Sequence, residues 1–411
     1  MKLLHFSDVH IGVESYGSID ENTGLHSRLI DFLETFDEVV EFAIGNEVDA
    51  VLFAGDAYKS RDPSQTHQKE FAKRIARLSS AGIPTFLLLG NHDMPNVVSR
   101  ATALDIFHTL KVPNIVIGDR LTTYKLETKG GLLQIIALPW IRRSSFLARE
   151  ETRNLNIEQI NEEVQTRITN LILEEIDKLD SSIPSVLVGH VSLNTAVNSS
   201  EKSMLLGSDP IIMQSTLANT SLDYVALGHI HKHQILSKNP YVVYSGSLER
   251  VDFGEENDDK GFCSIDIDPS LSKGNRVSDF TFNKVKSRRF LTIEVNVNKG
   301  QDPTLEAIKV IKRNHFAGSI VRVKISMDQD SELLFRENEN RFALEQAQFV
   351  TPIVKQIARD RRTRLGDIKT EELSVKQILE TYLESSGVEA ERKRILLSYG
   401  EDLMKSDYLE D

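Results

Sequence analysis

Short apolar runs alternate with longer amphipathic segments along the first part of the chain. Each run is four to six residues long and is bounded by Gly, Asp or Pro, as buried strands are. Apolar residues between the first two runs recur at helical spacing, which predicts a helix packed on a sheet. This alternation predicts an α/β fold. We expect strands at residues 3–6, 50–54, 85–89, 133–138, 185–188 and 224–227, and further helices at residues 64–80, 99–110 and 157–179.

The pattern changes near Arg288. Residues 290–297 and 320–325 alternate like half-exposed strands, and residues 305–313 between them have helical spacing, which fits a small α+β unit. Beyond Glu332 the strand signals cease, and the charged tail predicts helices. We expect these helices at residues 345–361, 374–385 and 389–403. The expected domains are residues 1–285, 286–335 and 336–411.

The composition restricts the class of protein. With 411 residues, of which 40% are hydrophobic, the chain is long enough for two or more domains. Its apolar runs fall far short of the roughly 20 residues that a membrane span needs, and its N-terminus becomes polar too early for a secretory signal. We therefore expect a cytoplasmic protein without a membrane partner. The single cysteine, Cys263, excludes an intramolecular disulfide and a thiolate metal cluster, so any metal must use oxygen and imidazole ligands.

The formal net charge of -12 argues against a protein that coats nucleic acid by bulk attraction. It does not exclude a nuclease, because divalent cations in an active site reverse the local electrostatics.

Clusters of polar residues stand directly after five of the predicted strands, in the sequences SDVH, AGDAY, GNHD, GHV and GHIH. The carboxyl ends of parallel strands line one edge of a sheet, so these clusters are expected to converge on one crevice. They supply two aspartates, one asparagine and four histidines, namely Asp8, His10, Asp56, Asn91, His190, His229 and His231. Each motif alone is weak evidence, since an aspartate before a helix is often a cap. Together they predict a site for two metal ions, because a carboxylate bridges two cations while imidazole and amide ligands complete each shell.

These motifs resemble the signature of the calcineurin-like metallophosphoesterase superfamily, D-x-H, G-D, G-N-H-D/E, G-H and G-H-x-H, and all five parts are present. The stretches YSGSLERVDFGEENDDKGF and GLHSRLIDF are similar to SbcD-type nuclease subunits, the bacterial counterparts of the meiotic recombination nuclease. The resemblance covers essentially the whole chain. It implies a metallophosphoesterase sandwich with a small α+β capping domain and a helical C-terminal tail.

The resemblance also implies a role for each residue of the motifs. One metal would be held by Asp8, His10, Asp56 and His231, and the other by Asp56, Asn91, His190 and His229, with Asp56 as the bridge. His92 would face the phosphate and either stabilise the transition state or protonate the leaving oxygen. Asp93 would fix the tautomer and orientation of His92.

The family resemblance favours manganese as the bound metal, although imidazole and carboxylate ligands also suit iron or zinc. Lys59 stands where archaeal and eukaryotic relatives carry a second histidine, so the role of that histidine does not transfer. Lys59 is either a phosphate contact or a solvated loop residue. His233 is expected not to be a ligand, because four imidazoles are already assigned.

The resemblance implies a metal-dependent DNA nuclease. It would act as a 3′ to 5′ exonuclease on duplex DNA and as an endonuclease on single strands. The implied processes are DNA end processing, replication, repair and recombination. The implied partners are DNA and an SbcC-type ATPase, which binds the C-terminal helices through a face that includes Val375, Ile378, Leu379 and Leu383. A homodimer paired through the helices at 64–80 and 99–110, within a heterotetramer, is also implied.

Two other functions stay open. A phosphatase acting on a small molecule or a phosphoprotein would use the same metal centre without needing the C-terminal segments. A non-catalytic scaffold that tethers DNA would not need the complete set of ligands. Several basic residues are candidates for contact with phosphate, but the sequence does not group them into a binding site. They include Arg61, Arg142, Arg143 and the arginines of the run 359–364.

Overall fold

The computed structural model describes residues 1–95, 100–141, 156–197, 211–358, 375–386 and 388–406, and its larger part contains two six-stranded sheets. The first sheet consists, in spatial order, of β14 (Val277–Lys284), β13 (Gly261–Ile267), β1 (Lys2–Phe6), β2 (Ala50–Phe53), β3 (Thr85–Leu88) and β4 (Ile115–Gly118). The second consists of β11 (Gln234–Lys238), β12 (Tyr241–Tyr244), β10 (Tyr224–Gly228), β7 (Ser185–His190), β6 (Gly131–Leu138) and β5 (Thr122–Thr128).

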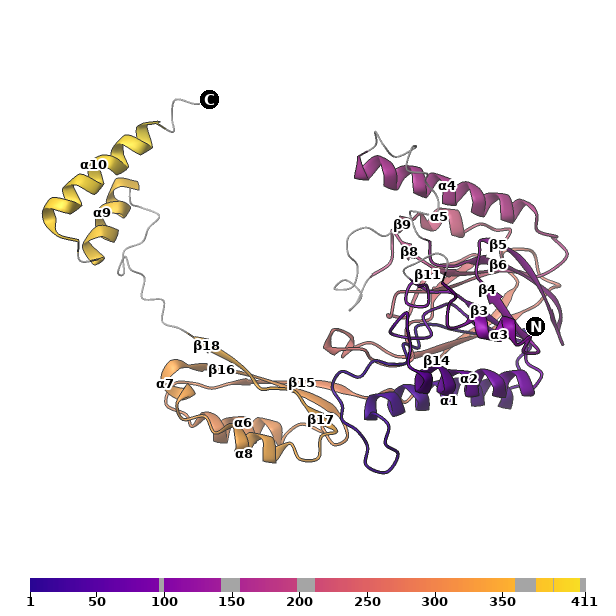
Figure 1. Cartoon of the computed structure of the whole chain (residues 1–411), viewed down its shortest axis with the longest axis horizontal. Coiled ribbons are helices and arrows are strands. Elements are labelled where there is room, and N and C mark those ends of the chain that lie inside the picture. Colours follow the sequence, from indigo (N-terminus) through magenta and orange to yellow (C-terminus); the bar gives the residue numbers. More distant parts are fainter. Residues whose placement is uncertain (96–99, 142–155, 198–210, 359–374, 387, 407–411) are drawn as a thin grey trace.

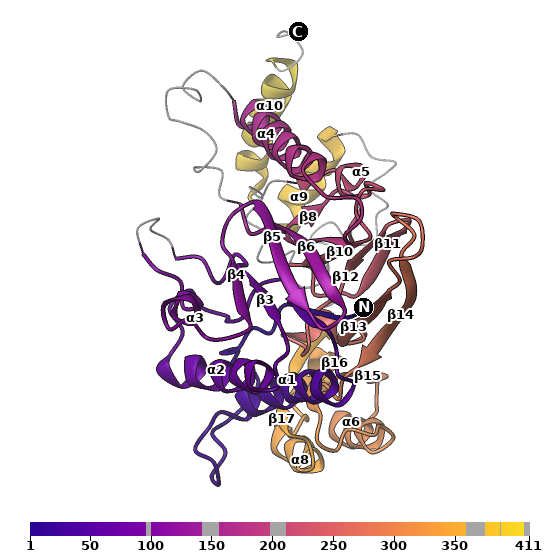
Figure 2. The same cartoon turned by 90° about the vertical axis from the view of Figure 1, so that its right-hand side faces the viewer.

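Helices cover the outer faces of both sheets, so the molecule has four layers in this part (Figures 1 and 2). Leu52 lies in the core between the sheets, whereas Val51 packs beneath α1 (Ser27–Gly45) and α2 (Gln65–Ser80). Ile168 of α4 (Ile157–Asp177) covers the outer face of the second sheet. Both faces of each central strand are therefore buried, which explains why these strands are continuous apolar runs. The predicted α/β sandwich is confirmed.

Parallel pairing brings the relevant strand ends to one edge. β1 pairs in parallel with β2, and β2 with β3, while β7 pairs in parallel with β6 and β10 in the second sheet. The turns that carry the five polar clusters follow β1, β2, β3, β7 and β10.

Most of the predicted helices form where their caps indicate. The Ser64 side chain accepts a hydrogen bond from the His67 amide at the start of α2, and Asn156 and Gln159 form a capping box at the start of α4. The helix predicted at residues 99–110 is shorter: α3 spans Asp105–Thr109, and residue 99 lies outside the described ranges. The edge strands β5 and β14 were not predicted, because their residues are mostly half-buried or exposed and carry mixed polarity.

A third sheet follows, in which β16 (Ile320–Asp328) pairs in parallel with β15 (Phe290–Asn296), β17 (Phe349–Val350) and β18 (Val354–Ala358). The connection between β15 and β16 contains α6 (Pro303–Ile311), and α7 (Gln329–Glu332) and α8 (Glu337–Ala343) follow β16. Figure 1 shows this sheet in orange beside the start of α1.

The helix predicted at residues 345–361 is wrong, because strands β17 and β18 occupy that segment. Pro352 separates the two strands, and a proline inside a helix removes a hydrogen bond and clashes with the preceding turn. Ile353 is instead buried in the core of the third sheet. The expected boundary at residue 335 would cut through this sheet, so we propose that the α+β unit extends to Ala358.

Two helices close the described chain, α9 (Val375–Ser385) and α10 (Ala390–Ser406), near the ranges predicted for them. Residue 374, the predicted start of the first, lies outside the described ranges. Lys393 of α10 contacts Glu380 and Glu384 of α9, at 3.3 and 2.5 Å. In the part of the chain that the structure describes, none of the helices has the length and apolar character to span a membrane.

Gly228 lies where the two sheets approach each other at the end of β10. A Cβ atom there would collide with the Ala54 carbonyl oxygen of the facing sheet. We expect Gly228→Ala to lower the free energy of unfolding by about 2 kcal/mol, the typical cost of overpacking. Gly45→Ala is the matched control, because a Cβ there meets open space and alanine favours a helix. Urea unfolding of both variants checks this, and equal midpoints for Gly228→Ala and the wild type would contradict it.

Candidate metal centre

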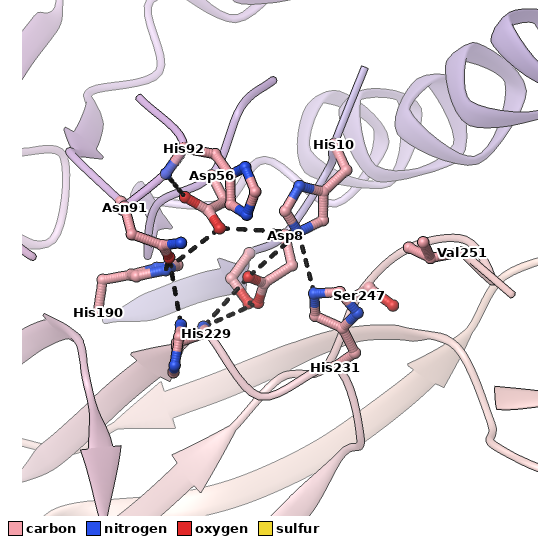
Figure 3. Close-up of polar contacts among 12 residues, drawn as sticks. Asp8, His10, Asp56, Asn91, His92, His190, His229, His231, Ser247 and Val251 are labelled. Atoms are coloured by element: carbon pink, nitrogen blue, oxygen red, sulfur yellow. Dashed lines mark hydrogen bonds and ion pairs between the residues drawn. The ribbon is translucent and has the colours of Figure 1, made fainter. Parts of the chain in front are cut away.

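The seven predicted metal ligands come together at the edge where the strands end (Figure 3). Six of them are buried, with at most 6% of the residue exposed: Asp8, His10, Asp56, His190, His229 and His231. Asn91 is partly exposed. Figure 3 shows the two aspartates in the middle, with His10 and His231 on one side and Asn91, His190 and His229 on the other.

The backbone turns sharply at these residues. Four of them have positive φ angles: 52° at Asp8, 47° at His10, 61° at Asp56 and 94° at His229. Residues other than glycine adopt this left-handed region infrequently, although aspartate and histidine do so more often than most. Strained backbone of this kind concentrates at functional sites, where the surrounding structure maintains it. Here it turns the chain directly after β1, β2 and β10.

One half of the cluster is formed by His10 and His231. Their Nε2 atoms are 2.9 Å apart, and the His10 Nε2 atom lies 3.9 Å from Asp8 Oδ1 and 3.7 Å from Asp56 Oδ2. In the other half, the His190 Nε2 atom lies 3.3 Å from Asp56 Oδ2 and 3.0 Å from Asn91 Oδ1. His229 Nδ1 completes this half, 3.2 Å from the same Asn91 oxygen. Asp56 is therefore close to both halves.

The residues fit divalent metal ions. Potential ligand atoms lie within 4.8 Å of one another in three groups: Asp8, His10 and His231; His10, Asp56 and His92; and Asp8, Asp56 and His190. Carboxylate oxygens and imidazole nitrogens are donors that divalent transition-metal ions accept, so the chemistry of these groups fits a metal centre.

The charges in the site favour a cation. Burial lowers the pKa of His229 to about 3 and that of His10 well below its usual value, so both rings are neutral, as metal ligands must be. At His190 burial also lowers the pKa, but the carboxylates of Asp56 and Asp8 and the hydrogen bond to the Ala54 carbonyl oxygen together raise the pKa to about 9. The carboxylates thus attract positive charge to the centre.

Several ligands are held by hydrogen bonds from their surroundings. The Ser7 hydroxyl donates to Asp8 at 2.5 Å, and the His229 amide also donates to Asp8. The His190 Nδ1 atom is 2.7 Å from the Ala54 carbonyl oxygen, which directs Nε2 to the cluster. Such contacts fix the orientation of metal ligands.

Asp93 does not orient His92, and this part of the prediction was wrong. The His92 Nδ1 atom is 2.8 Å from the Lys59 carbonyl oxygen. The Asp93 carboxylate instead accepts hydrogen bonds from the amides of Asp56, Ala57 and Gly90, at 2.8, 3.0 and 2.9 Å. These amides belong to the turns after β2 and β3, whose backbone polar groups need partners when buried. Asp93 therefore joins the two turns that carry Asp56 and Asn91.

His92 and Lys59 lie at the rim of the cluster. His92 is partly exposed, and its ring stands perpendicular to that of His10 at a centroid distance of 5.1 Å. Burial lowers the pKa of His92, and the positive charge of Lys59 adds to that shift. Lys59, whose carbonyl oxygen contacts the His92 ring, has a half-buried side chain.

The structure adds two residues that the sequence analysis did not identify. Glu255 lies 2.7 Å from the His231 Nδ1 atom, and the Trp140 ring lies 4.9 Å from the ring of His229. Trp140 follows β6 in the same way that the motifs follow their strands, and this position was an available signal. Glu255 is one of several acids in the segment 252–259, and nothing in the sequence distinguishes it.

The remaining candidates are His233, Arg61 and several arginines outside the described residues. The His233 ring stacks on Phe282, and its Nδ1 atom is 2.9 Å from the Tyr244 carbonyl oxygen, as expected for a residue that is not a ligand. Arg61 contacts the Asn91 carbonyl oxygen at 3.3 Å. Arg142, Arg143 and the arginines of the run 359–364 lie outside the described residues.

The joining role of Asp93 is testable. Asp93→Ala removes the acceptor of three amides, and each buried donor left unsatisfied costs about 1–3 kcal/mol. We therefore expect a loss of at least about 3 kcal/mol in the free energy of unfolding. Asp62→Ala, an exposed position in the loop before α2, is the control and should stay within about 0.5 kcal/mol of the wild type. Metal-free denaturant unfolding measures both, and an equally small effect at Asp93 would show that its hydrogen bonds are dispensable.

Comparison with known proteins agrees with this site. Residues 1–233 match the family model described as calcineurin-like phosphoesterase, which is more than half of the chain. The DNA double-strand break repair protein Mre11 of Aeropyrum pernix is 28% identical over 307 residues, covering 73% of this chain and 64% of that protein. The SbcD subunit of the SbcCD nuclease of Staphylococcus epidermidis is 24% identical over 325 residues, covering 77% of each.

A further relative is the SbcD subunit of the SbcCD nuclease of Escherichia coli K12, which is 25% identical over 263 residues, covering 62% of each chain. This chain thus spans slightly less than two thirds of the A. pernix and E. coli proteins. The family match rests on the region that contains all seven ligand positions, and it confirms the prediction of a metal-dependent phosphoesterase. The chain belongs to the calcineurin-like phosphoesterase family.

Proposed function

We propose that this protein is a two-metal DNA nuclease that works with an SbcC-type ATPase in DNA end processing, repair and recombination. The convergence of Asp56 with six further oxygen and imidazole ligands is the observation that carries the hydrolytic part of the proposal. The choice of DNA rests on the relatives, which are named as a double-strand break repair protein and as nuclease subunits.

The proposed ligand sets follow the two halves of the cluster. Asp8, His10, Asp56 and His231 hold one ion, and Asp56, Asn91, His190 and His229 hold the other. When bound, the two ions neutralise phosphate charge and lower the pKa of the attacking water. Manganese is the proposed metal, and iron and zinc suit the same donors.

His92 is the proposed acid–base residue. Because its Nδ1 atom is 2.8 Å from the Lys59 carbonyl oxygen, Nδ1 carries the proton that is donated there, and Nε2 stays free to act on the substrate. Protonated at Nε2, the ring donates to a phosphate oxygen or to the leaving oxygen of the cleaved bond. The family resemblance of its motif and its partly exposed position beside His10 support this role for His92.

The finer activities are part of this proposal. They comprise 3′ to 5′ exonuclease activity on duplex DNA and endonuclease activity on single strands. A cytoplasmic location is proposed as well. The α+β unit caps the DNA, and α2 and α3 pair two copies within a heterotetramer. Of the apolar residues expected to form that pairing surface, Ile106 at 48% and Leu110 at 67% are exposed and support it. The others, Phe71, Ile75, Leu78, Leu104 and Phe107, are buried in the core instead.

The nuclease assignment is tested with end-labelled duplex and hairpin DNA in Mn²⁺, with and without an SbcC-type ATPase and ATP. We expect cleavage by the wild type and a rate at least about 100-fold lower for His92→Ala, which is the lower end of general acid–base effects. His315→Ala, an exposed histidine outside the cluster, should cleave at the wild-type rate. Turnover of a phosphomonoester without any cleavage of DNA would favour the phosphatase instead.

The C-terminal helices are the proposed site for the ATPase partner. Leu383 of the expected docking face is only 7% exposed, but α10 exposes Ile395 (50%), Leu396 (39%) and Tyr399 (67%). Such a row of apolar residues on a helix suits docking in a partner groove.

A chain that ends after residue 374 should therefore lose binding to the ATPase and keep its Mn²⁺-dependent phosphodiesterase activity, because all proposed ligands precede that point. Ile395→Asp should weaken binding in the full chain, whereas the exposed charge change Glu391→Gln serves as the control. Pull-down and activity assays are run in parallel. Undiminished binding by the shortened chain would place the ATPase elsewhere on the protein.

A further inference from the structure

His231 differs from the other histidines of the site in the group that contacts its outer nitrogen. His190 and His92 each have Nδ1 beside a backbone carbonyl oxygen, of Ala54 and Lys59. The His231 Nδ1 atom instead lies 2.7 Å from a carboxylate oxygen, Oε1 of Glu255, while its Nε2 atom faces His10. Both side chains are buried, with exposures of 3% for His231 and 0% for Glu255.

The Glu255 carboxylate is held by further contacts. Its Oε2 atom accepts hydrogen bonds from the Val251 amide at 3.0 Å and from the Lys260 ammonium at 2.7 Å. Lys260 also donates to the His231 carbonyl oxygen at 3.0 Å and to the Ser247 hydroxyl at 2.8 Å. The same lysine therefore contacts the backbone of His231 and the carboxylate that faces its ring.

The loop that carries Glu255 is fixed from a second direction by Arg250. The guanidinium donates to the carbonyl oxygens of Glu255 at 3.1 Å and Asp258 at 2.8 Å. It also donates to the Ser287 hydroxyl at 2.8 Å and to the Arg288 carbonyl oxygen at 3.1 Å, in the segment that leads into β15. The carboxylate thus has a defined position before any metal binds.

We propose that Glu255 is a positioning residue for His231, which it holds with Nδ1 protonated and Nε2 directed at the metal centre. A carboxylate accepts hydrogen bonds and does not donate them, so Oε1 requires the proton on Nδ1. The lone pair of the neutral ring then lies on Nε2, the atom that faces the cluster. A carboxylate behind a ligand imidazole also increases its basicity. This inference rests on the proposed metal role of His231.

The tautomer is measured first, without any variant of Glu255. In the metal-free wild type, long-range ¹H–¹⁵N spectra of histidine-labelled protein should show His231 protonated at Nδ1, with its signal assigned from His231→Gln. A His231 ring protonated at Nε2 alone would overturn the proposal.

Metal affinity provides the second readout. Calorimetric titration of the full chain with Mn²⁺ alone should resolve two sites in the wild type, and Glu255→Ala should weaken one of them by about 10- to 100-fold, the usual effect of losing such a partner. The other site should change by less than about threefold, because its ligands do not contact Glu255. Glu256→Gln is the matched control: this neighbouring carboxylate contacts the Thr292 amide and hydroxyl instead of His231.

Glu255→Ala also leaves Lys260 buried without its carboxylate, so a second variant separates positioning from folding. In the double variant Glu255→Gln with Lys260→Met, the amide oxygen still accepts from Nδ1 and no buried charge stays unpaired. We expect it to regain an affinity within about fivefold of the wild type, which corresponds to about 1 kcal/mol. Thermal unfolding without metal reports whether each variant is folded.

The outcomes distinguish failure of the proposed role of Glu255 from failure of the proposed metal centre. Wild-type affinity at both sites in folded Glu255→Ala, or a folded double variant as weak as the alanine variant, would refute the role of Glu255. A wild type that binds no Mn²⁺ would instead refute the metal centre itself.

Discussion

The hydrogen bonds from three backbone amides to the Asp93 carboxylate determine where the other groups of the site lie. They join the turn after β2, which carries Asp56, to the turn after β3, which carries Asn91. The close approach of these turns is visible at Gly90, where a Cβ atom would collide with Asp56 Oδ1. Asp56 in turn accepts a hydrogen bond from the His92 amide at 2.8 Å. One buried carboxylate thus holds together the two turns that carry the proposed metal ligands Asp56 and Asn91.

The sequence was sufficient to predict that the proposed ligands lie together and insufficient to predict the groups that hold them. Ligands such as His190 and His229 follow apolar runs that are buried on both faces, so their strands and their common edge were predictable. The role of Asp93 was mistaken because its partners are backbone amides, which no sequence pattern displays. Glu255 was missed because its contact with His231 depends on a loop conformation set by Arg250 and Lys260.

The fold was predictable to a similar degree. Six central strands and the capped helices follow from apolar periodicity. Edge strands such as β14, which has no buried residue, do not, and the central strands β12 and β13 were also missed. The error at residues 345–361 arose because the charged surroundings suggested a helix, while Pro352 and the burial of Ile353 beside β16 favour strands. Pairing with β16 determines the structure of that segment in spite of its charged composition. Such pairing depends on the tertiary fold, so the local sequence does not reveal it.

The proposed ligands come from both sheets of the sandwich: Asp8 and Asp56 follow strands of the first, and His190 and His231 lie at the end of strands of the second. An ion held by both sets is a cross-link between the sheets. Its binding free energy then adds to the free energy of unfolding, because the unfolded chain does not present residues 8 and 231 together. The amount of folded protein in a cell would therefore depend on the supply of metal as well as on the sequence.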